Sequence, residues 1–280
     1  MEKPTKTPKS LPTMTTPDTK HWWGDFNIPK GEMLRWQIGP MTLWVERGKG
    51  EWRCGFSRTD DPVAHTLEPA ANCDIADMER AEEILRFADR SEAETITIAP
   101  APPGRSIVNR PDQPFFVPPK TTTTLFVSCP LWVNLGNSQL GKKILDEPIY
   151  RPSDTWFGPR NHEGELCYAS KTFCRTQLDE VPFRPHRAVT SVTLKNSSGS
   201  VLALEKIKIP SMNLGLYVDQ SGRIWTQDVT FERNADDDDF AEVGIVAGPP
   251  KAAEGATHIA PARSTASVNV AMRVFNSIFR

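Results

Sequence analysis

The sequence predicts a mainly β protein made of two antiparallel β-sandwich-like halves packed together, with few short helices. Three features indicate this class: a high proline content, short runs of alternating apolar and polar residues, and glycine- or asparagine-containing turns about ten residues apart. The chain holds 25 prolines in 280 residues, roughly 9% where about 5% is usual. Many of these prolines end a short apolar run, which opposes long helices.

The first half contains an antiparallel meander. Residues 34–38, 41–45 and 52–56 each alternate apolar and polar side chains, and a turn at residues 48–50 joins the last two. Trp44 is out of phase with its apolar neighbours, so it should point to the opposite face of the sheet, into a domain interface or into solvent. Further short strands are expected at residues 95–99, 115–117, 123–129 and 131–135.

The second half, from residue 182, has the cleaner strand pattern. Turn residues at 196–199 and 219–222 separate short apolar runs, and their glycines supply the positive φ that a tight hairpin needs. A segment rich in charged and aromatic residues lies between the halves, where a domain junction is expected. The sequence therefore predicts a disordered lead-in at residues 1–20, a first β domain at 21–148, a crossover segment at 149–181 and a second β-sandwich domain at 182–280.

Helical spacing occurs in two places. Asp77 could cap a helix with an apolar face from Met78 to Ala88, although residues 84–88 fit a strand as well. At residues 267–279, apolar side chains recur every three or four positions and predict a C-terminal helix. Two roles are open for that helix: it docks on its own domain, or it binds a partner.

Composition limits the class of function. With 33 basic and 35 acidic residues the net charge is −2, which argues against nucleic-acid binding. No apolar run reaches the roughly 18 residues of a membrane-spanning helix, and no secretory signal is evident, so we expect a cytoplasmic protein with reduced thiols. The five scattered cysteines and Asp236–Asp239 match no metal-ligand spacing, and no cofactor motif occurs, so no metal or cofactor is expected.

The candidate site lies in the crossover segment. We expect a cleft between the two domains, because such clefts are favoured ligand sites. Arginines would supply forked hydrogen-bond donors, Trp156 an apolar wall, and the carboxylates acceptors. The residues expected to line this cleft are Arg151, Asp154, Trp156, Arg160 and Glu165.

Three functions remain open from these residues. The first is a non-enzymatic binding or accessory protein that recognises a protein or small ligand at the cleft, with no catalytic residues assigned. The alternative is a hydrolase of a carbohydrate or ester, which would use Asp154, Glu163 or Glu165 as acid and base. The third is a structural partner of a membrane complex, which would dock through the C-terminal helix.

Several strings in the chain resemble an uncharacterised prokaryotic family, the domain of unknown function four-three-two. They are Trp22-Trp23-Gly24, Arg35-Trp36 with Ile38-Gly39-Pro40, residues 151–158, residues 164–169 and residues 184–188. The resemblance covers about residues 22–279 and implies no reaction and no functional residues. It also implies a link to small-conductance mechanosensitive channels, with a membrane channel as the partner of a cytoplasmic accessory protein.

Overall fold

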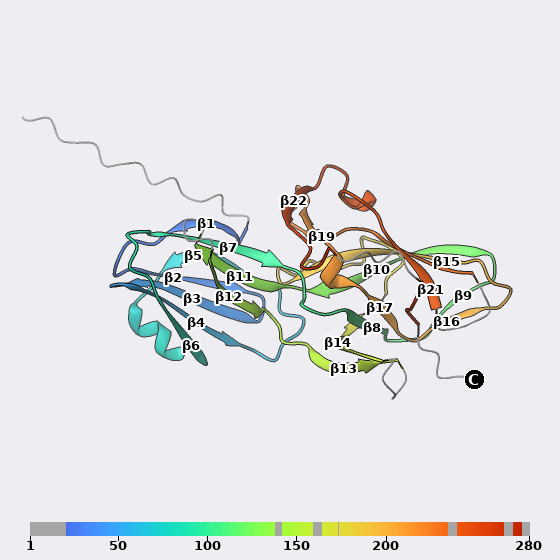
Figure 1. The fold of residues 1–280 in the computed structure, drawn as a ribbon, viewed down its shortest axis with the longest axis horizontal. Helices are drawn as coiled ribbons and strands as arrows, with labels where there is room; N and C mark the ends of the chain where they lie inside the picture. The colour runs from blue at the N-terminus through green and yellow to red at the C-terminus, as the bar shows by residue number, and fades with distance from the viewer. Residues whose placement is uncertain are drawn as a thin grey trace, which may run out of the picture.

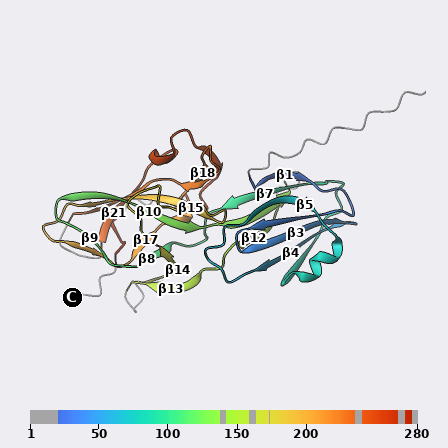
Figure 2. The same cartoon turned by 180° about the vertical axis from the view of Figure 1, so that it is seen from behind.

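The computed structural model describes residues 21–137, 142–158, 164–172, 174–234, 240–265 and 271–275. The expected disordered lead-in at residues 1–20 lies outside this part of the chain. The protein is mainly β and contains several sheets, including a curled half-barrel, so the predicted class is confirmed at that level. Figure 1 shows two lobes side by side along the long axis, and Figure 2 shows them from behind. None of the helices in the described ranges is long and apolar enough to cross a membrane.

The first lobe contains two sheets. Its strands are β1 (Gly24–Asn27), β2 (Met33–Ile38), β3 (Met41–Gly48), β4 (Glu51–Arg58), β5 (Leu67–Asn72), β6 (Glu83–Ala88), β7 (Thr95–Ala101), β11 (Trp132–Asn137) and β12 (Lys142–Pro148). One sheet has the order β1-β7-β11-β12 and the other the order β5-β2-β3-β4-β6. The two sheets share one apolar core, in which the ring centroids of Phe26 and Trp36 lie 5.1 Å apart.

The predicted alternation in the meander is confirmed. Met41, Leu43 and Val45 on β3 are fully buried in the core between the two sheets. Trp44 points to the opposite face, as expected, where it is 4% exposed and packs with Met78. That face is covered by the short 3-10 helix η1 (Ile75–Arg80), so Trp44 lies neither in a domain interface nor in solvent.

The helix expected to start at Asp77 is wrong. Asp74 is the cap instead, since its Oδ1 accepts a hydrogen bond from the Ala76 amide at 3.0 Å, and η1 ends at Arg80. The alternative for residues 84–88 is confirmed, because they belong to β6 and pair with β4. Strand pairing lets Leu85 and Phe87 pack against the first-lobe core, and this tertiary contact outweighs the local helical spacing.

The second lobe contains the remaining strands. They are β8 (Ile107–Pro111), β9 (Phe115–Val117), β10 (Thr121–Pro130), β13 (Ser153–Phe157), β14 (Glu165–Thr172), β15 (Arg187–Asn196), β16 (Leu202–Leu204), β17 (Ile207–Ile209), β18 (Leu216–Val218), β19 (Ile224–Thr226), β20 (Val229–Arg233), β21 (Phe240–Ile245), β22 (Thr257–Ala260) and β23 (Ala271–Arg273). Two short 3-10 helices, η2 (Ser211–Asn213) and η3 (Lys251–Ala253), interrupt them. Its largest sheet has the order β22-β18-β19-β15-β20-β21-β23, with β10 also paired to β15.

The pairing in this lobe is not purely antiparallel. β10 and β15 form a long antiparallel ladder from Thr121 opposite Asn196 to Pro130 opposite Arg187. However, β15 pairs in parallel with β19 and β20, and β14 pairs in parallel with β8. Parallel strands need long connections between them. The hairpins were predicted from short turns, so the parallel pairs could not be recognised in the same way.

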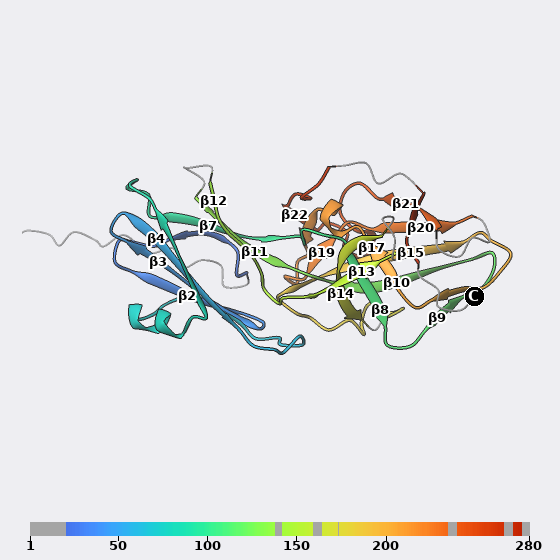
Figure 3. The same ribbon diagram turned by 60° about the horizontal axis from the view of Figure 1, so that its bottom comes forward.

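The predicted boundaries at residues 148 and 181 do not coincide with the sheets. β8, β9 and β10 precede residue 148, yet they pair with β14, β16 and β15 of the second lobe. Figure 3 shows β11 continuing from β10 across the junction. The first-lobe core also continues into the second lobe, where it includes Ala188 and Leu216.

The expected C-terminal helix is wrong where the structure describes it. Residues 271–273 form β23, which pairs antiparallel with β21. Val274 and Phe275 are buried in the second-lobe core, and the ring of Phe275 lies 6.3 Å from that of Phe231. The rest of the predicted helix lies outside the described residues, as does the acidic run at residues 236–239.

Candidate functional site

Two of the residues predicted to line a cleft do line one. Arg151 and Asp154 face a polar cleft of about 330 Å³ at the junction of the lobes. An Arg105 guanidinium nitrogen lies 2.9 Å from an Asp154 carboxylate oxygen, and the same guanidinium lies over the Tyr168 ring at 5.1 Å. Asp154 is therefore already paired with a cation inside the protein.

Trp156 and Glu165, the other predicted residues that the structure describes, do not join this cleft. β13 and β14 form a hairpin in which Asp154 is opposite Tyr168 and Phe157 is opposite Glu165. Strand alternation therefore puts Glu165 on the opposite face from Asp154, where it pairs with Lys208. Trp156 is 49% exposed and does not line the cleft. Arg160 and Glu163 lie outside the described residues.

This arrangement does not bring Asp154 and Glu165 together as an acid–base pair would require. Asp154 and Glu165 cannot act as an acid–base pair on one substrate, because they project from opposite faces of the hairpin. Burial, followed by the charge of Glu165, raises the pKa of the Cys167 thiol to about 12, so the nucleophilic thiolate is scarce at neutral pH. Within the described ranges, no group of three His, Cys, Asp or Glu side chains is placed to hold a metal ion.

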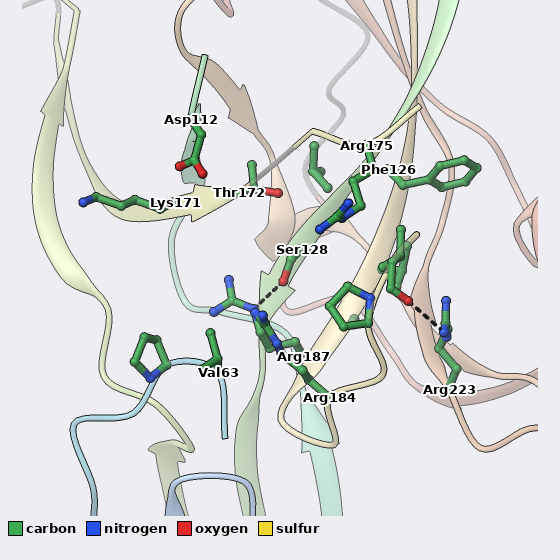
Figure 4. A pocket seen from close by; sticks show the side chains of 16 residues that line it. Val63, Asp112, Phe126, Ser128, Lys171, Thr172, Arg175, Arg184, Arg187 and Arg223 are labelled. Carbon is green, nitrogen blue, oxygen red and sulfur yellow. Dashed lines mark hydrogen bonds between the residues drawn. The ribbon is translucent and has the colours of Figure 1, made fainter. Parts of the chain in front are cut away.

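A second cavity, which we call the arginine pocket, lies where the second lobe meets a loop of the first. Its volume is about 250 Å³. β10, β14 and β15 supply its floor, and Pro62 and Val63 reach it from the loop between β4 and β5. Figure 4 shows Arg184 and Arg187 close to Ser128, with Arg223 farther along the pocket.

The described lining of the arginine pocket is strongly cationic. It contains Lys171, Arg175, Arg184, Arg187 and Arg223 and a single acid, Asp112. Two of these arginines have partners: Arg175 lies 3.5 Å from Glu180, and Arg223 donates to the Val181 carbonyl at 3.0 Å. The remaining cations are Arg184, Arg187 and the exposed Lys171.

Arg187 is a buried cation held by neutral groups. Only 8% of the residue is exposed; its Nε donates to the Ser128 hydroxyl, and its Nη2 donates to the Ser170 hydroxyl at 2.7 Å. Among the described residues, no carboxylate lies within ion-pair distance of Arg187 or Arg184. Burial, and then the charge of Arg184, lower the pKa of Arg187 to about 10. A buried charge without a counter-ion is costly, so the site favours an anion.

Arg184 stands beside it in a less enclosed position. Burial lowers the pKa of Arg184, the charge of Asp61 opposes that effect, and the charge of Arg175 adds to it. Asp61 lies beyond ion-pair distance, so its carboxylate does not occupy the N–H donors of the Arg184 guanidinium. Arginine presents several N–H donors in a planar fork that fits carboxylate and phosphate oxygens.

A tight turn holds the two arginines together. The Arg187 amide donates to the Arg184 carbonyl at 3.2 Å, at the point where β15 begins. Between them, His186 is fully buried, and its Nε2 lies 3.3 Å from the Pro62 carbonyl of the first lobe. The Trp22 indole also donates to the Pro185 carbonyl at 3.0 Å. Contacts with the first lobe therefore position both guanidinium groups.

The pocket lining also contains apolar side chains. Val63, Phe126, Val181 and Pro182 contribute hydrocarbon surface to the lining. Phe126 and Val181 also pack against a small buried cluster that includes Val189. The pocket lining thus combines forked donors with apolar side chains.

The chain matches the model of a known protein family. A family model described as protein of unknown function (DUF432) matches residues 22–280. The chain belongs to this family, and the resemblance stated from its sequence is confirmed. No curated protein and no solved structure matches the chain.

The sequence patterns do not single out the arginine pocket. In the sequence, Arg184 and Arg187 stand only within a string that carries the family resemblance. A signal is present, because Arg184 and Arg187 stand on either side of Pro185 and His186, two residues after Pro182. Asp179 and Glu180 are the nearest acids along the chain. The sequence does not reveal that neither of them pairs with Arg184 or Arg187.

Proposed function

We propose that this protein is a non-enzymatic binding protein that holds a small anionic ligand in the arginine pocket. The observation that carries the proposal is the buried Arg187 beside Arg184, with no carboxylate counter-ion among the described residues. An incoming carboxylate or phosphate would supply the missing negative charge. The pocket lies at the junction of the lobes, so the proposal keeps the expected inter-domain location and moves the site away from Arg151 and Asp154.

The rest of the lining supports binding rather than catalysis. Ser128 has a hydroxyl in the pocket, but it accepts a hydrogen bond from Arg187. An activated serine needs a neighbouring base, and the described lining contains no histidine. Hydroxyl groups, guanidinium groups and apolar side chains together hold a ligand without attacking it.

Titration calorimetry with sodium acetate, inorganic phosphate, octanoate and octyl phosphate tests the proposal. We expect at least one of these anions to bind with a stoichiometry of one. Hydrogen bonds to charged groups contribute about 1.5–3 kcal/mol, so Arg187→Met should weaken binding by at least tenfold. Arg184→Gln should also weaken it, and this second variant removes no protein hydrogen bond of the described structure.

Arg90→Gln is the matched control, because Arg90 is exposed in the first lobe and does not line the pocket. Its affinity should equal that of the wild type. Saturable binding that survives both pocket substitutions would place the anion elsewhere. Failure of all four anions to bind would overturn the proposed function.

A further inference from the structure

We propose that the ligand of the arginine pocket is an amphiphilic organic anion, with one carboxylate or phosphate head and an apolar body. This inference rests on the proposed function and names the class of ligand. The head would lie between Arg184 and Arg187, and the body would lie against Val63, Phe126 and Pro182.

The distribution of polar groups supports an anion with a single charged end. The two guanidinium groups without a carboxylate partner among the described residues belong to one turn, at the start of β15. Farther along, Arg175 is close to Glu180, and Arg223 donates to a backbone carbonyl. A second anionic group on the ligand would therefore meet arginines that already have protein partners, or Lys171, which is exposed to solvent.

The apolar lining argues against a small inorganic anion. A cavity of about 250 Å³ exceeds the space that phosphate or acetate fills, since one water occupies about 30 Å³ in the liquid. Most of the lining surface is hydrocarbon, and water against it is less favourable than a ligand's apolar body. Ligand sites commonly combine such a wall with a few placed polar groups.

The first lobe contributes to recognition of the body. Val63 is 53% exposed and reaches the pocket from the loop between β4 and β5. The adjacent Pro62 carbonyl is in contact with His186, which lies between the two arginines. Val63, which would contact the body, is thus linked through Pro62 and His186 to the arginines that would bind the head.

The test compares each head group with and without its apolar chain. Octanoate should bind at least tenfold more tightly than acetate, or octyl phosphate at least tenfold more tightly than inorganic phosphate. Tenfold corresponds to about 1.4 kcal/mol, which burial of two methylene groups exceeds. The octyl compound that binds more tightly shows whether the head is a carboxylate or a phosphate.

Two valine variants locate the apolar chain. Val63→Ser should weaken octanoate or octyl phosphate severalfold and leave acetate and phosphate unchanged. Val201→Ser is its control, because Val201 is equally exposed, at 52%, and lies outside the pocket. Both substitutions alter exposed side chains, so both variants should fold.

The outcomes separate this inference from the proposed function. If acetate or phosphate binds as tightly as its octyl counterpart, and Arg184→Gln weakens both, the anion site stands and the amphiphilic ligand is excluded. If 1-octanol binds as tightly as octanoate, the guanidinium groups contribute nothing and both proposals fail. If none of the probes binds, both proposals fail as well.

Discussion

At the scale of single residues, Gly39 and His186 make a close contact between the lobes. Gly39 lies in the turn between β2 and β3 with φ of +55°, and a Cβ there would come within 3.0 Å of His186 Cγ and closer still to Nδ1. Burial, and then the charge of Arg187, lower the pKa of His186 to about 3. The imidazole is therefore neutral at pH 7, which suits a fully buried ring beside two arginines.

Gly39→Ala should lower the free energy of unfolding by about 3 kcal/mol, because it combines backbone strain with overpacking. Gly50→Ala is the matched control. Gly50 has φ of +77°, but a methyl group added there would meet no atom within 4 Å, so only the strain of about 1 kcal/mol is expected. Urea unfolding of both variants measures the difference. Equal losses would show that His186 moves aside freely.

The residue scale also shows where sequence patterns stop being informative. The direction of Trp44 follows from strand alternation alone, because the period of two is a local property. The cover over Trp44 comes from η1, some thirty residues later, and no alternation encodes it. The roles of Arg184 and Arg187 depend on which acids fail to reach them. That is a property of the tertiary structure, so the pocket could not be predicted.

At the scale of elements, β23 shows how tertiary pairing overrides a local pattern. Apolar residues every three or four positions are compatible with a helix, but a strand can also bring one of them, Phe275, into a core. Pairing with β21 satisfies the backbone of residues 271–273. It also delivers Val274 and Phe275 to the second-lobe core. The meander, by contrast, was predictable, because its turns and alternation are local.

Phe275→Ala should lower the free energy of unfolding by about 3–5 kcal/mol, the usual cost of emptying a buried phenylalanine site. Phe116→Ala is the control, because Phe116 on β9 is 61% exposed, and its loss should stay within about 0.5 kcal/mol. Removal of all residues from Ser267 onward should destabilise the second lobe at least as much as Phe275→Ala. A truncated protein with the wild-type urea midpoint would contradict this structural role and favour a C-terminus that is free to dock on a partner.

At the scale of the whole molecule, the junction is part of the core. Trp22 and Ile38 of the first lobe belong to the same buried cluster as Ala188 and Leu216 of the second. The mainly β class could be read from the sequence. The pairing of β8, β9 and β10 with later strands could not, because it is set by contacts far apart in the chain.

One ion pair ties distant parts of the chain across this junction. Arg263, which follows β22, donates from both terminal nitrogens to Asp146 on β12, with each contact at 2.6 Å. Its Nε also donates to the Pro102 carbonyl. Burial raises the pKa of Asp146, but hydrogen bonds from Arg263 and Lys143 outweigh that effect, and the net pKa is lowered.

A lowered pKa in the folded state fixes the sign of the pH dependence. The stabilisation is complete above the ordinary aspartate pKa of about 3.9 and is lost as the pH falls through the lower folded value. Asp146→Asn should therefore reduce the free energy of unfolding by about 1.5–3 kcal/mol at pH 7, and the difference from wild type should shrink below pH 4. Asp154→Asn is the control, because that carboxylate is 62% exposed in its pair with Arg105 and should contribute less than about 1 kcal/mol. Urea titrations from pH 7 to pH 2.5 follow both variants. A difference for Asp146→Asn that is constant across this range would show that the contact between the lobes does not depend on the carboxylate's charge.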